Sequence, residues 1–561
     1  MSEKRLDSGQ TLGEQPRGIL TQELASEEAQ KDTQEQGYFN KDRAPLYEAL
    51  LKYREQKRIS FHVPGHKNGQ AYASQGGAGV LSEMMEIDVT EITGTDDLHH
   101  PEGVILEAQQ LAANCFGAEE SFFLVGGSTV GNLALILTVC STQGDILLVQ
   151  RNVHKSVLHG LMLAGAQAVF LQPQMDSFSG LSTAPTVAQI DAALEVYPNA
   201  KGVLVTMPNY YGMGTDLALL ADACHRHGVP LLVDEAHGAH YGQHSALPAS
   251  ALACGADGVV QSTHKMLSAL TMSAMLHVQG ARLDRALLRQ RLAMVQSSSP
   301  SYPMMASLDL ARRQLHIGGA ATFTAGLAAV DAFKRGLAEL PRFRLLAPQQ
   351  PGGTPAGFAL AGNTSQPSAA MAAYTTQDPF KAVIYDGTGA LDGYELQRQL
   401  EARGCIPEMS DPRYVVLLFS LGSTMEDTNH LLGALQHISI AGADTHLDPE
   451  DIRSMKNAVE FSTWNITEAS VSTPVSFNLK PVSSEHVESI PLVQCAGRVA
   501  AEMIIPYPPG IPLLYMGESI SEDTIELLLV LSEAGAKCHA ATDPELQRIM
   551  VFKKDRKQEY S

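Results

Sequence analysis

The sequence has little of what marks secreted, membrane-spanning or nucleic-acid-binding proteins. Its 561 residues include seven cysteines and one tryptophan. No C-x-x-C pair, no apolar signal core and no run of about 18 apolar residues appears, so we expect neither a secretory leader nor a membrane span. Acidic residues outnumber basic ones by 61 to 40, a formal net charge of -21. This charge disfavours nucleic-acid and anionic-membrane partners and modestly favours cationic small molecules, although it can also serve solubility alone.

Cysteine spacing and chain length set further limits. The odd number and wide spacing of the cysteines predict free, mostly buried thiols in a reducing cytosol. The length is too great for one small core and predicts two to four domains. The segment Gly126-Gly127-Ser128-Thr129 lacks both the GK[ST] ending of a Walker loop and the pattern G-x-G-x-x-G, so a dinucleotide site is not expected there.

Composition changes divide the chain into six regions. Residues 1–37 are polar and predict a disordered tail. Residues 38–100 combine an amphipathic helix pattern, which begins at Pro45, with loops that carry histidines. The other predicted regions are a large domain over 101–345, a linker or exposed loop over 346–375, a small α+β domain over 376–445 and a C-terminal domain over 446–561.

Helical patterns alternate with short apolar strands between Pro101 and Val278. This rhythm predicts a parallel sheet covered on both faces, with ligands bound at the carboxyl ends of its strands. The predicted strands are Ser121–Val125, Asp145–Gln150, Ala168–Leu171, Gly202–Met207, Val229–Val233 and Gly258–Val260.

An acid and a lysine follow two of these strands. Asp234 comes directly after Val233, and Lys265 follows Val260 with Ser262 and His264 beside it. A lysine amine can bond to a carbonyl cofactor, and a carboxylate can hold a pyridine nitrogen in its protonated form. Singly, such an aspartate is usually a turn or helix cap and such a lysine a solvated surface residue. Their joint presence favours a site for pyridoxal phosphate.

Two more segments indicate ligand contacts. Gly126-Gly127-Ser128-Thr129 joins a strand to a helix, so its N–H groups and hydroxyls suit a phosphate, although such a segment is often only a turn. His154 follows the strand Asp145–Gln150, where its ring can stack on an aromatic ring or merely cap the next helix.

These segments together resemble the Orn/Lys/Arg decarboxylase family of pyridoxal-phosphate enzymes, which have the aspartate-aminotransferase fold, fold type I. The resemblance extends from about Pro45 to Phe552 and rests on eight motifs in order. The motifs are FHVPGHKNG (61–69), DVTEITGTDDLHHPEG (88–103), GGSTVGN (126–132), RNVHKS (151–156), VDEAHGAH (233–240), STHK (262–265), SSSPSY (297–302) and IPYPPGIPLL (505–514).

The resemblance implies a fold type I α/β large domain with smaller α+β C-terminal domains, the last of them the decarboxylase C-terminal domain. Lys265 would form the Schiff base with the cofactor, Asp234 would pair with the ring nitrogen, and His154 would stack on the ring. His237 would lie near the ring oxygen or the substrate carboxylate. The residues implied in phosphate binding are Ser128, Thr129, Ser262 and His264, together with Ser298 in the segment Ser297–Ser299, which would reach the site of a neighbouring subunit.

The implied activity is decarboxylation of arginine, lysine or ornithine to CO2 and a di- or polyamine precursor. We expect a cytoplasmic homodimer or higher homo-oligomer without metal, nucleic-acid or membrane partners. Candidate acids for the substrate's cationic end are Glu518, Asp96 and Asp97. The segment before Lys265 follows the family, whereas Met272 stands where a polar residue is expected and is read as a packing variant. The chain resembles shorter members, which lack an N-terminal response-regulator-like domain.

Two other functions remain open from the residues. One is a pyridoxal-phosphate aminotransferase or lyase of the same fold, in which Arg413 would clamp the substrate carboxylate. The other is a catalytically silent regulatory homologue, which the intact Lys265, Asp234 and His154 disfavour.

Overall fold

The computed structural model describes residues 40–348, 373–441, 471–506, 510–533 and 536–554. The predicted polar tail, most of the predicted linker and the first part of the predicted C-terminal domain, up to residue 470, lie outside these ranges. Chain contacts separate Met1–Arg43 from Ala44–Ser561, and the description below concerns the second unit. Within the described ranges, no helix combines the length and the apolar composition of a membrane span.

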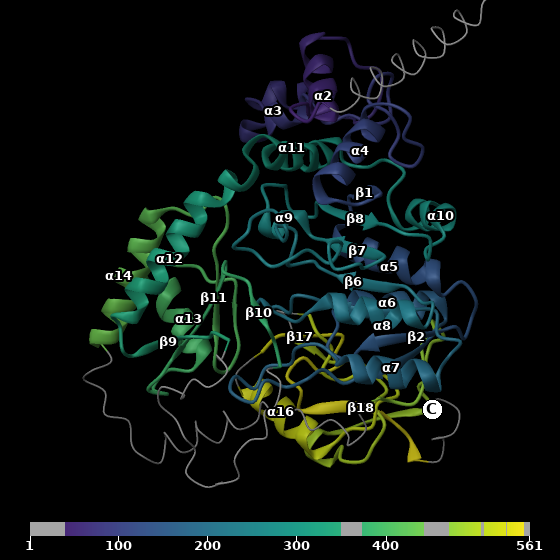
Figure 1. The fold of residues 1–561 in the computed structure, drawn as a ribbon, viewed down its shortest axis with the longest axis vertical. Coiled ribbons are helices and arrows are strands. Elements are labelled where there is room, and N and C mark those ends of the chain that lie inside the picture. Colours follow the sequence, from purple (N-terminus) through teal and green to yellow (C-terminus); the bar gives the residue numbers. More distant parts are fainter. Residues whose placement is uncertain (1–39, 349–372, 442–470, 507–509, 534–535, 555–561) are drawn as a thin grey trace, which may run out of the picture. The chain divides into compact units, whose positions relative to one another are not determined.

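The large domain is built on an eight-stranded sheet in the order β1-β8-β7-β6-β4-β2-β3-β14 (Figure 1). Its strands are β1 (Glu120–Leu124), β2 (Ile146–Gln150), β3 (Gln167–Leu171), β4 (Val203–Thr206), β6 (Leu231–Asp234), β7 (Gly258–Gln261), β8 (Ala274–Val278) and β14 (Val475–Ser476). The six predicted strands are all present, with ends shifted by no more than two residues.

The sheet is mixed, which differs from the predicted parallel sheet. Strands β3, β2, β4, β6 and β7 are mutually parallel neighbours. Strand β8 runs antiparallel to β7 and β1, and β14 runs antiparallel to β3. The link from β7 to β8 contains only the one-turn helix α9 (Thr263–Met266), whereas a parallel connection usually needs a full crossover helix.

Alternate residues of the strands face two separate hydrophobic clusters. In β6, Leu231 and Val233 belong to one cluster and Leu232 to the other. Because side chains alternate across a strand, burial on both faces requires the continuous apolar runs seen in the sequence. The flanking helices are α4 (Val104–Phe116), α5 (Gly127–Val139), α6 (Lys155–Ala164), α7 (Val187–Val196), α8 (Leu217–Arg226), α10 (Arg285–Val295) and α11 (Tyr302–Gly318).

The segment before α4 is mostly loop. It contains α2 (Pro45–Glu55), α3 (Ser82–Met85) and the 3-10 turns η1 (Gln70–Gln75) and η2 (Gly79–Leu81). Helix α2 packs on the unit through the buried side chains of Leu46 and Leu50. The backbone N–H of Leu46 donates to Asp309 of α11, which fixes where this helix begins.

The small domain has a four-stranded antiparallel sheet in the order β12-β13-β11-β9. Its strands are β9 (Phe343–Leu345), β11 (Lys381–Asp386), β12 (Met409–Ser410) and β13 (Val415–Leu418), and its helices are α12 (Thr324–Ala338), α13 (Gly393–Glu401) and α14 (Met425–Ala441). The turn η3 (Gly319–Phe323) precedes α12, and β10 (Thr376–Gln377) pairs with β5 (Met213–Gly214) of the large domain.

The C-terminal segment has its own hydrophobic cluster around helix α16 (Glu522–Glu533). Its strands pair as β15 (Val487–Pro491) with β18 (Arg548–Phe552) and β16 (Ile505–Pro506) with β17 (Cys538–His539), and η5 (Leu492–Gln494) follows β15. The guanidinium of Arg151, after β2, joins this segment by pairing with Glu518 at 2.8 Å.

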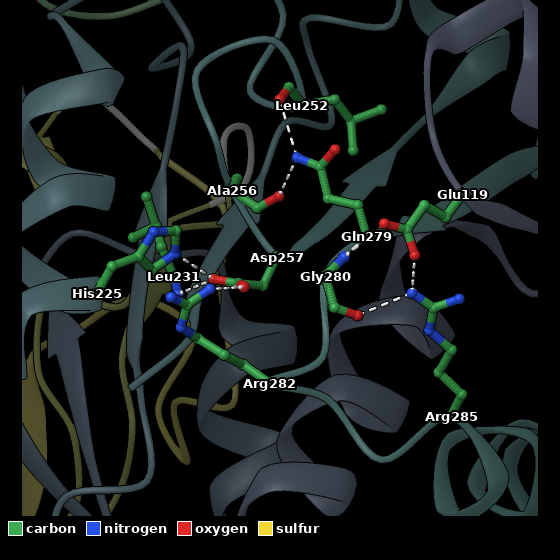
Figure 2. A network of polar contacts seen from close by, with 10 residues as sticks. All are labelled: Glu119, His225, Leu231, Leu252, Ala256, Asp257, Gln279, Gly280, Arg282 and Arg285. Atoms are coloured by element: carbon green, nitrogen blue, oxygen red, sulfur yellow. Dashed lines mark hydrogen bonds and ion pairs between the residues drawn. The ribbon is translucent and has the colours of Figure 1, made fainter. Parts of the chain in front are cut away.

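The amino ends of β6 and β7 are closed by a buried polar network (Figure 2). The Asp257 carboxylate accepts the Leu231 N–H at 2.9 Å and pairs with Arg282 at 3.2 Å and with His225 at 2.9 Å. These contacts connect helix α8 to the starts of two adjacent strands. They leave the opposite, carboxyl edge of the sheet as the place for a ligand.

Candidate active site

The carboxyl edge of the sheet gathers most of the predicted site residues. Asp234 is the last residue of β6, Ser262 directly follows β7, and Lys265 lies in α9. His154 follows β2 and precedes α6, and Ser128 lies in the first turn of α5 after β1. Parallel strands place their carboxyl ends at one edge, which is why residues far apart in the sequence meet here.

Asp234 is almost fully buried and held by two donors. Its Oδ2 accepts the Asn132 side-chain amide at 2.8 Å, and its Oδ1 accepts the Ala236 N–H at 3.1 Å. Asn132 also donates to the Ser156 hydroxyl at 3.0 Å, which lies 2.9 Å from His154 Nδ1. A chain of four side chains therefore fixes the carboxylate and the imidazole relative to each other.

His154 is the N-cap of helix α6. Its Nδ1 accepts the backbone N–H of Ser156 at 3.2 Å, so the capping alternative raised by the sequence is what the structure shows directly. Burial lowers the pKa of His154 to about 4, against the raising effect of Asp234, and the ring is neutral near pH 7. The cap uses an edge of the ring and does not compete with stacking on its face.

His237 lies between two lysines. Its Nε2 is 2.9 Å from Lys265 Nζ, and its Nδ1 is 3.1 Å from Lys381 Nζ. The ring of Tyr210 meets the His237 ring edge-on, with 4.4 Å between centroids. Burial lowers the pKa of Lys265, lowers that of His237 well below its ordinary value and lowers that of Lys381 to about 8.

The start of helix α5 is shaped for close backbone approach. Gly126 is its N-cap, no side chain caps the helix, and a Cβ on Gly126 would lie 2.6 Å from Val130. Gly127 adopts φ +73°, a conformation that favours glycine. Ser128 is half-buried, whereas Thr129 is exposed. The first N–H groups of this helix are therefore available to an anion.

Several hydroxyls at the same edge are buried without a partner. Among the residues that the structure describes, Ser262, Thr263 and Thr206 each have a buried side-chain oxygen that makes no hydrogen bond. Leaving buried hydroxyls unpaired is costly, which indicates that a polar ligand completes them. The ring of His264 is instead engaged, with Nδ1 2.9 Å from the Ser273 carbonyl oxygen, and burial lowers its pKa.

Ser298 is not joined to this cluster within the chain. It is exposed, and the described hydrogen bonds of its loop join Ser297 with Ser299 and run from His99 Nε2 to the Ser297 carbonyl oxygen. Met272 is 48% exposed with φ +73°, so the expectation of a packing variant is wrong for this residue.

The three acids suggested for the substrate's cationic end have structural partners. Glu518 is bound to Arg151 in a mostly buried pair. Asp96 accepts the N–H groups of Gly103 and Ile105 at the start of α4, and Asp97 accepts the N–H of His99. Arg413, the alternative carboxylate clamp, lies over the rings of Tyr385 and Tyr414 at 5.0 and 5.1 Å.

Three residues of the site went unpredicted: Tyr210, Lys381 and Glu408. The Tyr210 hydroxyl donates to Glu408 at 2.6 Å, and the Glu408 charge raises the pKa values of Lys265 and Lys381 against the effect of burial. Tyr210 lies a few residues beyond β4, so the strand-end rule could have identified it. Lys381 and Glu408 belong to the small domain. The local sequence does not show that this domain packs against the carboxyl edge of the large sheet.

A separate cavity of about 440 Å³ lies beside β1 and the start of α4. Its lining includes His99, Glu120, Arg289 and Gln296 and none of the predicted site residues. The cluster around Lys265, with its unpaired hydroxyls and shifted pKa values, is therefore the candidate active site.

Comparison with known proteins gives two family matches. Residues 44–427 match the family described as Orn/Lys/Arg decarboxylase, major domain, and residues 463–544 match its C-terminal domain. The chain belongs to the Orn/Lys/Arg decarboxylase family. Members of this family are pyridoxal-phosphate-dependent decarboxylases, so the chain is an amino-acid decarboxylase that uses this cofactor, as predicted.

Relatives cover nearly the whole chain. An arginine decarboxylase of Bacillus anthracis is 32% identical over 511 residues, 91% of this chain and 97% of the relative. The lysine decarboxylase LdcA of Pseudomonas aeruginosa is 27% identical over 86% of this chain and 75% of the relative. The solved structure of the Francisella novicida lysine decarboxylase LdcF covers 91% of this chain and 81% of its own at 20% identity, with a TM-score of 0.73. This last likeness shows the fold, and the predicted fold type I architecture is confirmed.

The residues present fit pyridoxal phosphate. The cofactor needs an amine for its carbonyl, an acid for its ring nitrogen and donors for its phosphate. Lys265 and Asp234 would supply the first two, and the uncapped start of α5 with the unpaired Ser262 hydroxyl would supply donors. The side chains and N–H groups present therefore match the carbonyl, the ring nitrogen and the phosphate of the cofactor.

Proposed function

We propose that this family member decarboxylates a basic amino acid, arginine first and lysine second, to CO2 and the corresponding amine, a polyamine precursor. The observation that carries the proposal is that a buried carboxylate, Asp234, and a half-buried amine, Lys265, follow the adjacent strands β6 and β7 at the same edge of the sheet. Arginine is preferred because the relatives at 32% identity over most of the chain are arginine decarboxylases.

The proposed roles follow the positions of the side chains. Lys265 would bond to the cofactor's carbonyl carbon, and Asp234 would accept a hydrogen bond from its protonated ring nitrogen. When bound, pyridoxal phosphate supplies a ring that takes up the electron pair left by the departing carboxylate. Because Asn132 and the Ala236 N–H fix both carboxylate oxygens, Asp234 needs no reorganisation to stabilise a positive ring.

Phosphate binding would use the start of α5. Its free N–H groups, the hydroxyls of Ser128 and Thr129, and the unpaired hydroxyl of Ser262 supply donors without a compensating acid among them. His264 would contribute through Nε2, since its backbone N–H and its Nδ1 both contact the Ser273 carbonyl oxygen. His154, held neutral and oriented by Ser156, would stack on the cofactor ring.

His237 would face the substrate carboxylate or the ring oxygen. Its pKa is lowered by burial and by both neighbouring lysines, so it acts as a neutral hydrogen-bonding group near pH 7. The rings of Tyr210 and His237, which meet edge-on, would exclude water from the substrate carboxylate and so favour its loss as neutral CO2.

Glu408 would bind the cationic end of the substrate. It is exposed, its charge reaches Lys265 and His264, and the Tyr210 hydroxyl orients it. A carboxylate can take a guanidinium through two parallel hydrogen bonds or an ammonium as a point charge, which suits arginine and lysine. The three acids first considered are occupied by structural contacts, so Glu408 replaces them.

We also propose a cytosolic homodimer. Two observations support it: the loop Ser297–Ser299 is exposed, and the segment before α4 exposes apolar side chains such as Phe61 (92%) and Val80 (97%). All seven cysteines are free, and Cys140, Cys224 and Cys495 are buried, which suits a reducing compartment.

A product assay tests the proposed reaction. Purified protein with added pyridoxal phosphate is incubated separately with arginine, lysine and ornithine, and CO2 and the organic product are measured. We expect CO2 and an amine from arginine or lysine. A keto acid in place of the amine would assign an aminotransferase, and no product from any of the three would remove basic amino acids as substrates.

A glutamate substitution tests the substrate contact. Glu408→Gln removes the charge and keeps the hydrogen bond from Tyr210, so we expect KM for the basic substrate to rise about tenfold or more, the scale of one charge-assisted contact. Glu395, an exposed-face acid of α13 paired with Arg398, offers the control Glu395→Gln, which should leave KM unchanged.

A further inference from the structure

Lys381 is a buried lysine whose function no motif predicted. It is the first residue of β11 in the small domain, 3% exposed, and its Nζ lies 3.1 Å from His237 Nδ1. On the other side of the same ring, Lys265 Nζ lies 2.9 Å from Nε2. One imidazole therefore connects the proposed cofactor lysine of the large domain to a lysine of the small domain.

The hydrogen-bonding capacity of these groups restricts their charge. An ammonium has only donors, and a neutral imidazole has one donor and one acceptor. Two ammonium groups would require two acceptors on His237, which the ring does not have. In every state in which both contacts are hydrogen bonds, at most one of Lys265, His237 and Lys381 is a cation.

We propose that Lys381 is a positioning residue that, through His237, takes the proton from Lys265 and keeps the Lys265 amine available as a nucleophile. This inference rests on the proposed role of Lys265, whose amine must be unprotonated to bond to a carbonyl carbon. It gives the small domain a part in preparing the cofactor lysine.

The proton transfer balances within the three side chains. The Lys265 ammonium gives a proton to His237 Nε2 while His237 Nδ1–H gives its proton to the neutral amine of Lys381. The products are a neutral Lys265, an imidazole protonated on Nε2 and a Lys381 ammonium, and the total charge stays at one. The two contacts, at 2.9 and 3.1 Å, are short enough for both steps.

The surroundings allow either lysine to hold the charge. Lys381 faces Asp378 and Glu408, which favour its ammonium, and burial lowers its pKa to about 8. Lys265 faces Asp234 and Glu408. His154 and His264 also lie near His237, and their protonated forms would disfavour a positive charge on it. Because the pKa of Lys381 is close to neutral pH, it can accept and return a proton.

The protonation state of Lys265 is measurable without the cofactor. The full-length protein, stripped of pyridoxal phosphate, is labelled with trace acetic anhydride over a pH series, and the modified Lys265 peptide is quantified by mass spectrometry. Only the neutral amine reacts. In Lys381→Met, which is similar in size, Lys265 alone holds the charge, so the labelling midpoint should move up by about one pH unit, a tenfold loss of labelling at neutral pH.

An arginine substitution separates proton transfer and charge from simple packing. Lys381→Arg keeps a permanent donor on Nδ1, so Nε2 carries the ring proton and Lys265 stays neutral, with a midpoint at or below the wild-type value. The control Lys334→Met removes a half-buried lysine of α12 in the same domain and should leave the midpoint unchanged. The rate of pyridoxal phosphate uptake, measured by the absorbance of the bound cofactor over the pH series, should rank the variants in the same order as the extent of Lys265 labelling.

The outcomes are distinct. An unchanged midpoint in Lys381→Met, or equal upward shifts in the Met and Arg variants, overturns the inference. The labelling midpoints can follow the expected order while the protein takes up no pyridoxal phosphate. In that case the proton sharing stands and the proposed role of Lys265 is overturned. Unchanged labelling in a protein that binds the cofactor and releases CO2 overturns the inference alone.

Discussion

Lys265 is the residue on which the proposed chemistry depends most directly. It lies in the one-turn helix α9 and is only partly accessible, so removal of its side chain beyond Cβ leaves the strands around it intact. We expect Lys265→Ala to abolish CO2 release and the visible absorbance of bound pyridoxal phosphate while circular dichroism stays unchanged. A cofactor adduct that borohydride still fixes in this variant would make another lysine, such as Lys381, the anchor.

Asp234 offers a more graded test. Asp234→Asn keeps an oxygen for Asn132 or for the Ala236 N–H, so the variant should fold and bind the cofactor. The amide cannot stabilise a positive ring nitrogen, and we expect the rate to fall about a hundredfold or more, the scale of losing one preorganised electrostatic partner. Turnover near the wild-type rate in steady-state assays would remove Asp234 from this role.

At the residue scale, the strand-end rule explains what the sequence could predict. Asp234, Ser262, Lys265 and His154 each follow an apolar run, and parallel strands bring such positions to one edge. The acids Glu518, Asp96 and Asp97 stay predictions, since the sequence does not show whether a carboxylate has a backbone or arginine partner. Their contacts with Arg151, with the start of α4 and with His99 depend on the folded structure and cannot be read from the sequence.

Among the elements, β6 and β7 depend on Asp257 at their amino ends. Removing its charge leaves Arg282 and His225 without their carboxylate while the Leu231 N–H can keep an oxygen (Figure 2). Since breaking a buried ion pair costs roughly 3 kcal/mol, Asp257→Asn should lower the free energy of unfolding by about that much in urea titrations.

The matched control for this element lies on the surface. Asp191 pairs with Arg226 and His227 in partly exposed contacts, so Asp191→Asn should cost less than about 1 kcal/mol. The substrate KM should stay unchanged in both variants, because Asp257 lies at the edge opposite the site. Equal stability losses in the two variants would contradict a special role for the buried network.

Strand β8 carries a buried histidine that makes stability depend on pH. Burial lowers the pKa of His277 to about 3, and its ring contacts Ser121 and Gln261. The unfolded chain protonates its histidines near pH 6.5. As the pH falls from 6.5 towards 3, the unfolded state therefore binds more protons, and the stability that is fully present above pH 6.5 is lost by up to several kcal/mol.

A substitution isolates this contribution. His277→Gln keeps a polar group between Ser121 and Gln261 and removes the titration, so the free energy of unfolding should fall less steeply between about pH 7 and about pH 5 than in the wild type. His227→Gln, at a partly exposed site, serves as the control and should keep the wild-type slope. Parallel slopes in all three proteins would show that His277 does not govern acid stability.

At the element scale, the apolar patterns predicted where strands lie in the sequence better than whether neighbouring strands run parallel or antiparallel. The runs that became β2, β3, β4 and β6 were found because strands buried on both faces need continuous apolar residues. The antiparallel β8 and β14 were not, since pairing direction depends on the connection and, for β14, on a segment about 300 residues away from its partner β3.

For the whole molecule, the order of the motifs along nearly the full chain was enough to predict the family and fold. It could not predict that Lys381 and Glu408 of the small domain complete the site, because their approach depends on how the small domain packs against the large one. The pairing of β10 with β5 belongs to the same contact between the two domains. The local periodicity of apolar residues carries no information about how two domains pack together.

Subunit assembly is the remaining whole-molecule question, and mixing inactive chains can answer it. If Ser297–Ser299 completes the phosphate site of a second subunit, a Lys265→Ala chain and a chain with alanines at these three serines are each inactive alone. In a mixed dimer, one site combines an intact Lys265 with an intact serine loop, so random re-association should restore about a quarter of the wild-type sites in a CO2-release assay.

The control mixture joins two defects that lie in the same subunit's half of the site. Lys265→Ala mixed with Asp234→Asn should gain no activity, because neither site in the mixed dimer has both residues intact. Sedimentation at assay concentration should show a dimer for every variant. An active monomer, or no recovery in the serine-loop mixture while its dimers form, would show that Ser298 serves no neighbouring subunit, and Lys265 and Asp234 would then hold a site made by one chain.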